Sequence, residues 1–143
     1  MTKKVVINKC FGGFGLSYAG TMRYAEIKGM NLYAFSASYK EGIKKFRLLK
    51  KNEAEAEEGF IHYLKTPNWE EYEANNEPNE LYFHGRDLQR DDPALVQVVE
   101  EMGEKCWGRC AKLAIVEIPE DIEFTVENYD GQELVAEKHR TWM

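Results

Sequence analysis

The apolar positions of this chain form short β-branched runs separated by two helical stretches. Lys4 to Asn8 is typical of a buried strand, and it leads into the glycine-rich sequence Phe11-Gly12-Gly13-Phe14-Gly15. Ser17 is placed to cap a first helix that continues to Lys28, and Gly29 follows as a typical C-terminal glycine. The chain is therefore expected to open with a strand, a glycine-rich turn and a helix.

A second helix is predicted from Pro93 to Met102. Asp92 is a favourable capping residue, and proline is well tolerated at the first helical position that follows it. Apolar residues then recur at i, i+3, i+4 and i+7, which places them on one helical face: Leu95, Val98, Val99 and Met102. Gly103 ends this predicted helix.

The remaining apolar runs predict strands. They cover residues 31–39, 43–49, 80–84, 113–118, 122–127 and 134–142. The run from Leu113 to Ile118 is expected to be a central strand, and Asp130-Gly131 is a two-residue hairpin signal. We expect a single α+β domain over residues 1–143, with a mainly antiparallel sheet and two principal helices.

Net charge is distributed unevenly along the 143 residues, which together carry −6. Residues 51–80 contain two lysines and nine glutamates, a net charge of −7, and the other 113 residues carry +1. This acidic, irregular insert is most simply a solvated loop. The overall charge argues against a protein that wraps duplex DNA, whereas a small anionic ligand remains compatible with the near-neutral remainder.

Membrane association, disulfide bonding and catalysis find little support in the sequence. No apolar run approaches the length that crosses a bilayer, and no signal peptide precedes the first strand. The three cysteines (Cys10, Cys106 and Cys110) are expected to be reduced, inert thiols without a catalytic partner or a zinc-binding arrangement. We therefore expect no enzymatic activity, no metal site and no cofactor.

The glycine-rich turn carries the strongest candidate chemistry. Backbone N–H groups at such a turn, next to a helix N-terminus that Ser17 would cap, favour a phosphate. Phe11 and Phe14 could stack a base while the amides of Gly12, Gly13 and Gly15 hold its phosphate. The alternative is that the glycines only permit a tight turn above packed phenylalanines, because the sequence matches neither common nucleotide-binding fingerprint.

Arginines could supply the positive charge that such a ligand needs. Four are candidates: Arg86, Arg90, Arg109 and Arg140. Arginine binds phosphate bidentately, but its commoner role is a surface ion pair, and aspartates stand close to the first two in the sequence. Only convergence of two or three arginines on one face would favour a phosphate site.

Three sequence blocks carry a resemblance to known proteins. They are Val5 to Ser17, Arg90 to Gly103, and a C-terminal set formed by Ile115–Pro119, Tyr129-Asp130-Gly131 and Glu137–Trp142. Together they resemble a large, mostly uncharacterised family of small tailed-phage proteins, over roughly the first 17 and last 55 residues. Trp107 departs from the family's pattern, which has a small residue and an asparagine there.

The resemblance implies a phage protein that acts in the cytoplasm of an infected bacterial host. Proteins of this size often antagonise host defence, and one class consists of sponges that sequester cyclic nucleotide or cyclic ADP-ribose immune signals without cleaving them. We expect such a sponge for a small phosphorylated nucleotide, in the form of a homo-oligomer. The alternative is a protein–protein inhibitor of a host defence effector or nuclease, which would act through the acidic insert.

Overall fold

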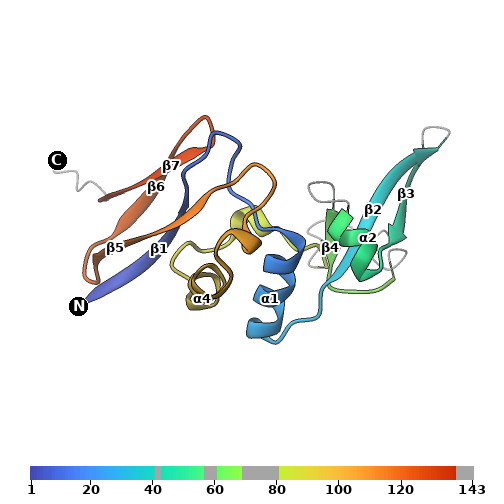
Figure 1. Ribbon diagram of the computed structural model, residues 1–143, viewed down its shortest axis with the longest axis horizontal. Helices are drawn as coiled ribbons and strands as arrows, with labels where there is room; N and C mark the ends of the chain where they lie inside the picture. The colour runs from blue at the N-terminus through green and yellow to red at the C-terminus, as the bar shows by residue number, and fades with distance from the viewer. Residues whose placement is uncertain (41–42, 57–60, 69–80, 138–143) are drawn as a thin grey trace, which may run out of the picture.

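The computed structural model describes residues 1–40, 43–56, 61–68 and 81–137 of the chain. It has 29% helix and 36% strand, all of its sheets are antiparallel, and two of its helices have seven or more residues. The predicted α+β class is therefore confirmed. The elements are arranged along one long axis, with three strand groups and a central pair of helices (Figure 1).

The first strand, β1 (Thr2–Asn8), pairs antiparallel with β5 (Leu113–Pro119), so that Val5 lies opposite Val116. Val5 and Val6 have no solvent exposure, as expected of a β-branched run. The predicted central position of β5 is wrong within the described residues, because β1 is its only partner there.

A second sheet occupies the other end of the molecule. Its order is β3 (Ile43–Leu48), β2 (Tyr33–Lys40) and β4 (Ile61–Leu64), and the short helix α2 (Lys51–Ala56) lies beside it (Figure 1). The strand predicted at residues 80–84 is replaced by a single bridge from Tyr82 to Leu64. The chain leaves the sheet there because a 3-10 helix, η1 (Gly85–Asp87), begins almost at once.

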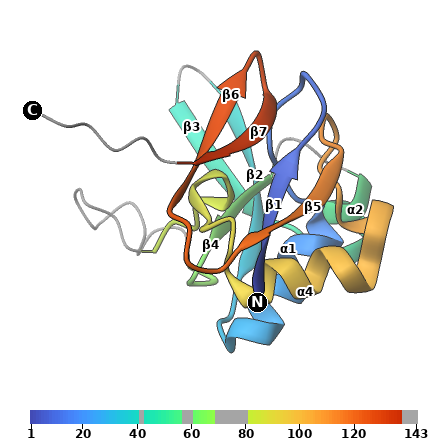
Figure 2. The same cartoon turned by 90° about the vertical axis from the view of Figure 1, so that its left-hand side faces the viewer.

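The third sheet is a hairpin of β6 (Phe124–Tyr129) and β7 (Gln132–Glu137). Its turn has positive φ at both Asp130 (53°) and Gly131 (95°), the conformation that an Asp-Gly hairpin requires. The predicted hairpin is therefore confirmed. It stands beside β1 and the loop that follows β1, as both views show (Figures 1 and 2).

Helices α1 (Tyr18–Lys28) and α4 (Pro93–Met102) pack together and carry most of the core, at the boundaries that the sequence predicts. Ser17 caps α1, Asp92 caps α4 through the N–H of Ala94, and Gly29 has the left-handed conformation. The core contains these fully or almost fully buried residues: Val6, Tyr24, Leu95, Val98 and Cys106. No helix in the described ranges is long and apolar enough to cross a membrane.

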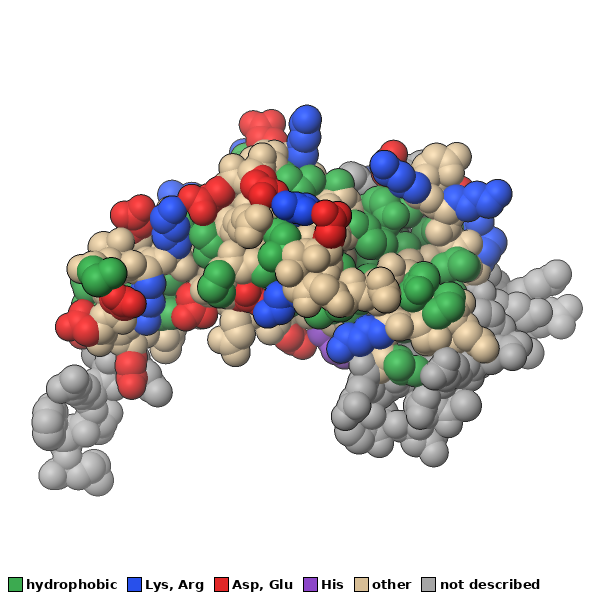
Figure 3. All heavy atoms as spheres, turned by 90° about the horizontal axis from the view of Figure 1, so that it is seen from below, with side chains coloured by type: hydrophobic (Ala, Val, Ile, Leu, Met, Phe, Trp, Pro, Cys, Tyr) green, Lys and Arg blue, Asp and Glu red, His purple; other side chains and the backbone are tan. Residues whose placement is uncertain are grey.

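Acidic and basic side chains are interspersed over the face seen from below (Figure 3). Ion pairs also join the helices, since Arg23 on α1 bonds to Glu26 at 2.6 Å and to Glu101 of α4 at 2.9 Å. Lys4 of β1 likewise pairs with Glu100 of α4 at 2.7 Å. The charges of Arg23 and Lys4 are thus neutralised locally.

Candidate functional site

The glycine-rich turn, residues 11–15, lies against two segments that are distant in sequence. A Cβ atom added to Gly12 would lie 2.1 Å from the Cβ of Cys110, and one added to Gly131 would lie 2.4 Å from the carbonyl oxygen of Phe11. A Cβ added to Gly108 would lie 2.8 Å from the carbonyl carbon of Gly15, and the Gly108 N–H donates to the Gly15 carbonyl at 2.9 Å. Glycine is therefore required where the three backbones meet.

Asn8, at the end of β1, binds all three of these segments. Its buried side-chain amide donates to the carbonyls of Cys10 and Gly131, each at 2.7 Å. Its carbonyl oxygen accepts from the N–H groups of Cys10 (3.2 Å) and Lys112 (2.9 Å). Sequence reasoning did not identify this residue, and only its position directly before the turn could have suggested it.

Phe14 and Arg90 lie beneath the turn, not at its surface. The Phe14 ring is 7% exposed, and the Arg90 guanidinium lies 3.6 Å from its centroid. Arg90 bonds to both carboxylate oxygens of Glu133, the longer contact at 2.9 Å, and the Glu133 side chain is only 4% exposed. Glu133 also accepts from the Asn8 N–H at 2.8 Å, so Arg90 is held within the protein.

Ser17 and the N-terminus of α1 are likewise engaged by protein. The Ser17 hydroxyl donates to the Lys105 carbonyl at 2.6 Å and accepts from the Gly20 N–H at 3.1 Å. The 3-10 helix η2 (Gly103–Cys106) covers this helix end, where a Cβ on Gly20 would lie 2.9 Å from the Cys106 carbonyl oxygen. The helix N-terminus therefore adds no open anion site to the turn.

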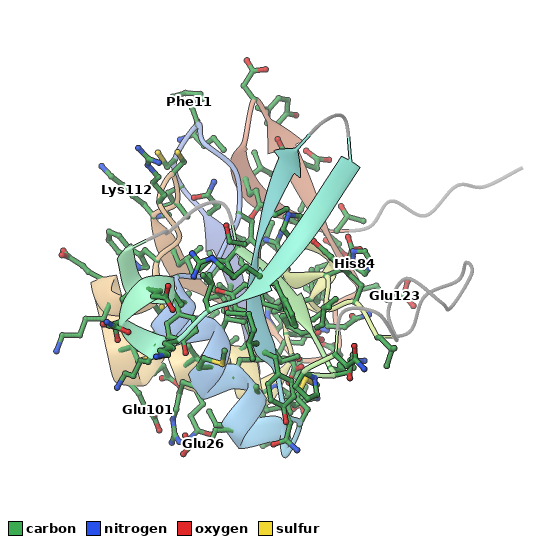
Figure 4. The ribbon with its side chains drawn as sticks, turned by 90° about the vertical axis from the view of Figure 1, so that its right-hand side faces the viewer. Phe11, Glu26, His84, Glu101, Lys112 and Glu123 are labelled. Carbon is green, nitrogen blue, oxygen red and sulfur yellow. The ribbon has the colours of Figure 1, made fainter. Side chains whose placement is uncertain are left out.

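The outer side of the turn is exposed to solvent, in contrast to the side that covers Phe14 and Arg90. The Phe11 side chain is 68% exposed, and no described residue accepts a hydrogen bond from the N–H groups of Phe11, Gly12 or Gly13. Lys9 and Lys112 are both exposed cations. Their backbones are neighbours, because the Lys9 N–H donates to the Lys112 carbonyl at 2.7 Å. Phe11 and Lys112 stand at the same end of the molecule (Figure 4).

Arg109 is the one predicted arginine whose described side chain belongs to this outer surface. It is exposed and lies between Gly108 and Cys110, the two residues that touch the turn. Within the described residues, Lys9, Arg109 and Lys112 form no ion pair. Their charges are therefore unpaired within the described residues, on segments whose backbones contact a turn with N–H groups that have no described acceptor. Such a combination favours an anion.

The other two predicted arginines contribute no described side chain. Arg86 lies in η1, at a distance along the chain from the turn, and its side chain is outside the described residues. Arg140 and the rest of residues 138–143 are also outside them. The structure thus brings together Phe11, the glycines and Arg109, and it adds Lys9 and Lys112, which sequence reasoning missed.

A hollow of about 510 Å³ opens on the other side of Arg90. Its lining includes three carboxylates, those of Asp87, Asp91 and Glu123. The cations among its described lining residues are Arg90 and Lys3, whose Nζ lies 5.0 Å from the centroid of the Phe124 ring. Three carboxylates disfavour a phosphate there because Arg90 is already bound to Glu133. The outer side of the turn is therefore the better anion site of the two.

Cys106 has no free surface with which to react. It is fully buried, its Sγ donates to the Gly103 carbonyl at 3.1 Å, and burial raises the pKa of its thiol to about 11. Trp107 packs against the same core, and its buried indole N–H has no hydrogen-bond partner among the described residues. No three metal-binding side chains converge in the part of the chain that the structure describes.

Comparisons with known proteins add no assignment for this arrangement. No family model matches the chain, and no match was found among the curated proteins or the solved structures. The turn, the cations on its neighbouring segments and its buried support are therefore the features of the molecule that indicate a function.

Proposed function

We propose that this protein binds a small phosphorylated nucleotide at the outer side of the glycine-rich turn and sequesters it without converting it. The observation that carries the proposal is the surface formed by Phe11, the free N–H groups that follow it, and three exposed cations (Lys9, Arg109 and Lys112). Backbone donors and cations bind phosphate, and an exposed aromatic ring offers a base a stacking partner.

The biological role that fits this chemistry is that of a phage-encoded sponge for a nucleotide immune signal. The resemblance to small tailed-phage proteins supports the setting, an infected bacterial cell. A homo-oligomer, which would place a second copy of the turn nearby, belongs to the same proposal. Arg90 and Phe14 then act as buried support for the turn and do not contact the ligand.

Binding calorimetry with a panel of cyclic dinucleotides, cyclic trinucleotides and cyclic ADP-ribose isomers tests the proposal. The bound ligand should be recovered intact after the protein is denatured, as judged by mass spectrometry. Arg109→Glu and Lys112→Glu should each lower affinity about ten-fold or more, since each replaces an attractive charge with a repulsive one. Lys51→Glu, the same change on an exposed residue of α2 at the far end, is the matched control.

Two results would overturn the proposal. One is that no nucleotide of the panel is retained; the other is that Arg109→Glu, Lys112→Glu and Lys51→Glu all bind as well as the unaltered protein. A chemically changed product would instead identify an enzyme. Most glutamates of the acidic insert lie outside the described residues, so its role in protein–protein inhibition stays a prediction.

A further inference from the structure

The turn of the β6–β7 hairpin brings a second exposed aromatic ring to the same end of the molecule. Tyr129 is 61% exposed, and Phe11 is 68% exposed. The two residues belong to backbones in direct contact, because Gly131 packs on the carbonyl of Phe11 and Asn8 donates to the Gly131 carbonyl. The glycine-rich loop and the hairpin stand side by side in both ribbon views (Figures 1 and 2).

Neither the Phe11 ring nor the Tyr129 ring contributes to the packing of the described residues. Neither belongs to a hydrophobic cluster of the described residues, and no ring contact joins one to the other. The Tyr129 hydroxyl donates only a long hydrogen bond, 3.3 Å, to Glu127 on its own strand. Both rings are thus available to a planar ligand.

The charges around the rings are polarised. Lys9, Arg109 and Lys112 lie on the segments at one side of the turn, whereas Glu127 and Asp130 belong to the hairpin. A phosphate is attracted to the first side and repelled by the second. Carboxylates on the hairpin instead suit the N–H and O–H donors of a base and a sugar.

We infer that Tyr129 is a base-contacting residue of the site, and that the bound nucleotide points its phosphate toward Lys112 and its base toward the hairpin. This inference rests on the proposed function. It adds a contact residue that sequence reasoning left out and gives the ligand a direction. The ligand class is a nucleoside phosphate whose base and sugar both carry hydrogen-bond donors.

Three simple probes separate the two ends of the site: AMP, ribose 5-phosphate and adenosine. Chemical-shift titration by NMR measures each dissociation constant with the full-length protein, including weak ones. Because base stacking on an aromatic side chain contributes an affinity factor of about 5 to 150, AMP should bind more tightly than ribose 5-phosphate by about that factor.

Single substitutions should then change the affinities of the three probes in different ways. Tyr129→Ala should weaken AMP and adenosine about ten-fold and leave ribose 5-phosphate unchanged, whereas Tyr129→Phe should retain AMP binding. Lys112→Ala should weaken AMP and ribose 5-phosphate and leave adenosine unchanged. Leu48→Ala, which removes an exposed apolar side chain from β3 at the far end, is the control that should change nothing.

The outcomes distinguish this inference from the proposed function. If AMP and ribose 5-phosphate bind equally well and Tyr129→Ala changes neither, nucleotide binding at the turn stands but the role of Tyr129 is overturned. If neither phosphate-bearing probe binds the unaltered protein, this inference is overturned, and the proposed function fails as well only if no nucleotide of the cyclic panel is retained. A thermal melt of Tyr129→Ala that matches the unaltered protein shows that a loss of binding reflects the missing ring.

Discussion

The guanidinium of Arg90 lies 3.6 Å from the centroid of the Phe14 ring and binds the carboxylate of Glu133 through two nitrogens. The arrangement joins the glycine-rich turn, the loop before α4 and the β6–β7 hairpin. Arginine suits it because its planar group can stack on one face and form paired hydrogen bonds at its edge. The pair therefore supports the proposed site from below.

Breaking this pair should destabilise the fold strongly. Glu133→Gln keeps the shape of the side chain but leaves a buried arginine without its counter-charge, and we expect a loss of about 3 to 5 kcal/mol in the free energy of unfolding. Urea denaturation measures it. The double variant Arg90→Met with Glu133→Gln should recover part of the loss, and a Glu133→Gln protein as stable as the unaltered one would contradict the interpretation.

Two neighbouring glycines should respond very differently to an added methyl group. Gly12→Ala places a Cβ 2.1 Å from the Cβ of Cys110 and 2.3 Å from its carbonyl oxygen, so the two loops must separate, at a cost of about 1 to 3 kcal/mol. Gly15→Ala meets no atom within 4 Å and should stay within about 0.5 kcal/mol of the parent. Equal stabilities of the two variants in urea denaturation would refute the close-packed geometry.

The cap of α4 should make stability depend on pH through Asp92. Burial by itself raises the pKa of this carboxyl group, but hydrogen bonds from Tyr24 (2.7 Å), the Ala94 N–H (2.9 Å) and Lys28 (3.3 Å) outweigh it, and the pKa lies below 3.8. The charged carboxylate is thus the form that the fold stabilises. Its contribution is complete above the ordinary pKa and is lost as the pH falls below it.

Tyr24→Phe tests that dependence because it removes one of the three donors. We expect a loss of about 1.5 to 3 kcal/mol at pH 7, where the acceptor is charged. The difference between variant and parent should shrink in unfolding experiments near pH 3. Tyr18→Phe, on the same helix, is the control, because the Tyr18 hydroxyl donates to no carboxylate of the described residues, and it should show no such change with pH. A Tyr24→Phe deficit that stays constant with pH would rule the mechanism out.

The three cysteines should react with iodoacetamide in a fixed order. Cys110 is exposed, Cys10 is half-buried and Cys106 is fully buried with a thiol pKa of about 11, so almost none of Cys106 is the reactive thiolate at pH 8. Mass spectrometry of the native protein should show label on Cys110 first and on Cys106 only after denaturation. Equal labelling of all three would show that η2 opens readily.

Local signals predicted the helix boundaries and the hairpin well. Ser17, Asp92-Pro93 and Asp130-Gly131 each fix backbone geometry through contacts within a few residues, so their effect can be read from the sequence. The strand predicted at residues 80–84 was reduced to one bridge because a neighbouring 3-10 helix, and not its own composition, decided its length.

The candidate site was predictable only in part, because contacts between residues distant in the sequence decide which of its side chains are exposed and unpaired. The sequence suggests Arg90 as a phosphate-binding side chain, but Glu133 neutralises it from 43 residues away. Phe14 and Phe11 are equivalent in the sequence, yet one is 7% and the other 68% exposed. Nothing in the sequence marks Lys9, Lys112 or Tyr129 as site residues, and only the contact between their backbone segments brings them to one end of the molecule.

The hydrogen bonds of Asn8 determine when, during synthesis of the chain, the turn can be fixed in place. The Asn8 N–H can form its hydrogen bond only after Glu133, 125 residues later, has been synthesised. The Asn8 side chain likewise requires Lys112 and Gly131 for its hydrogen bonds. At about 5 to 20 residues per second, a ribosome needs roughly 6 to 25 seconds to supply that last partner. A nascent or truncated chain that ends before Glu133 therefore lacks the buried support of the turn, and it should not form the surface proposed to bind the nucleotide.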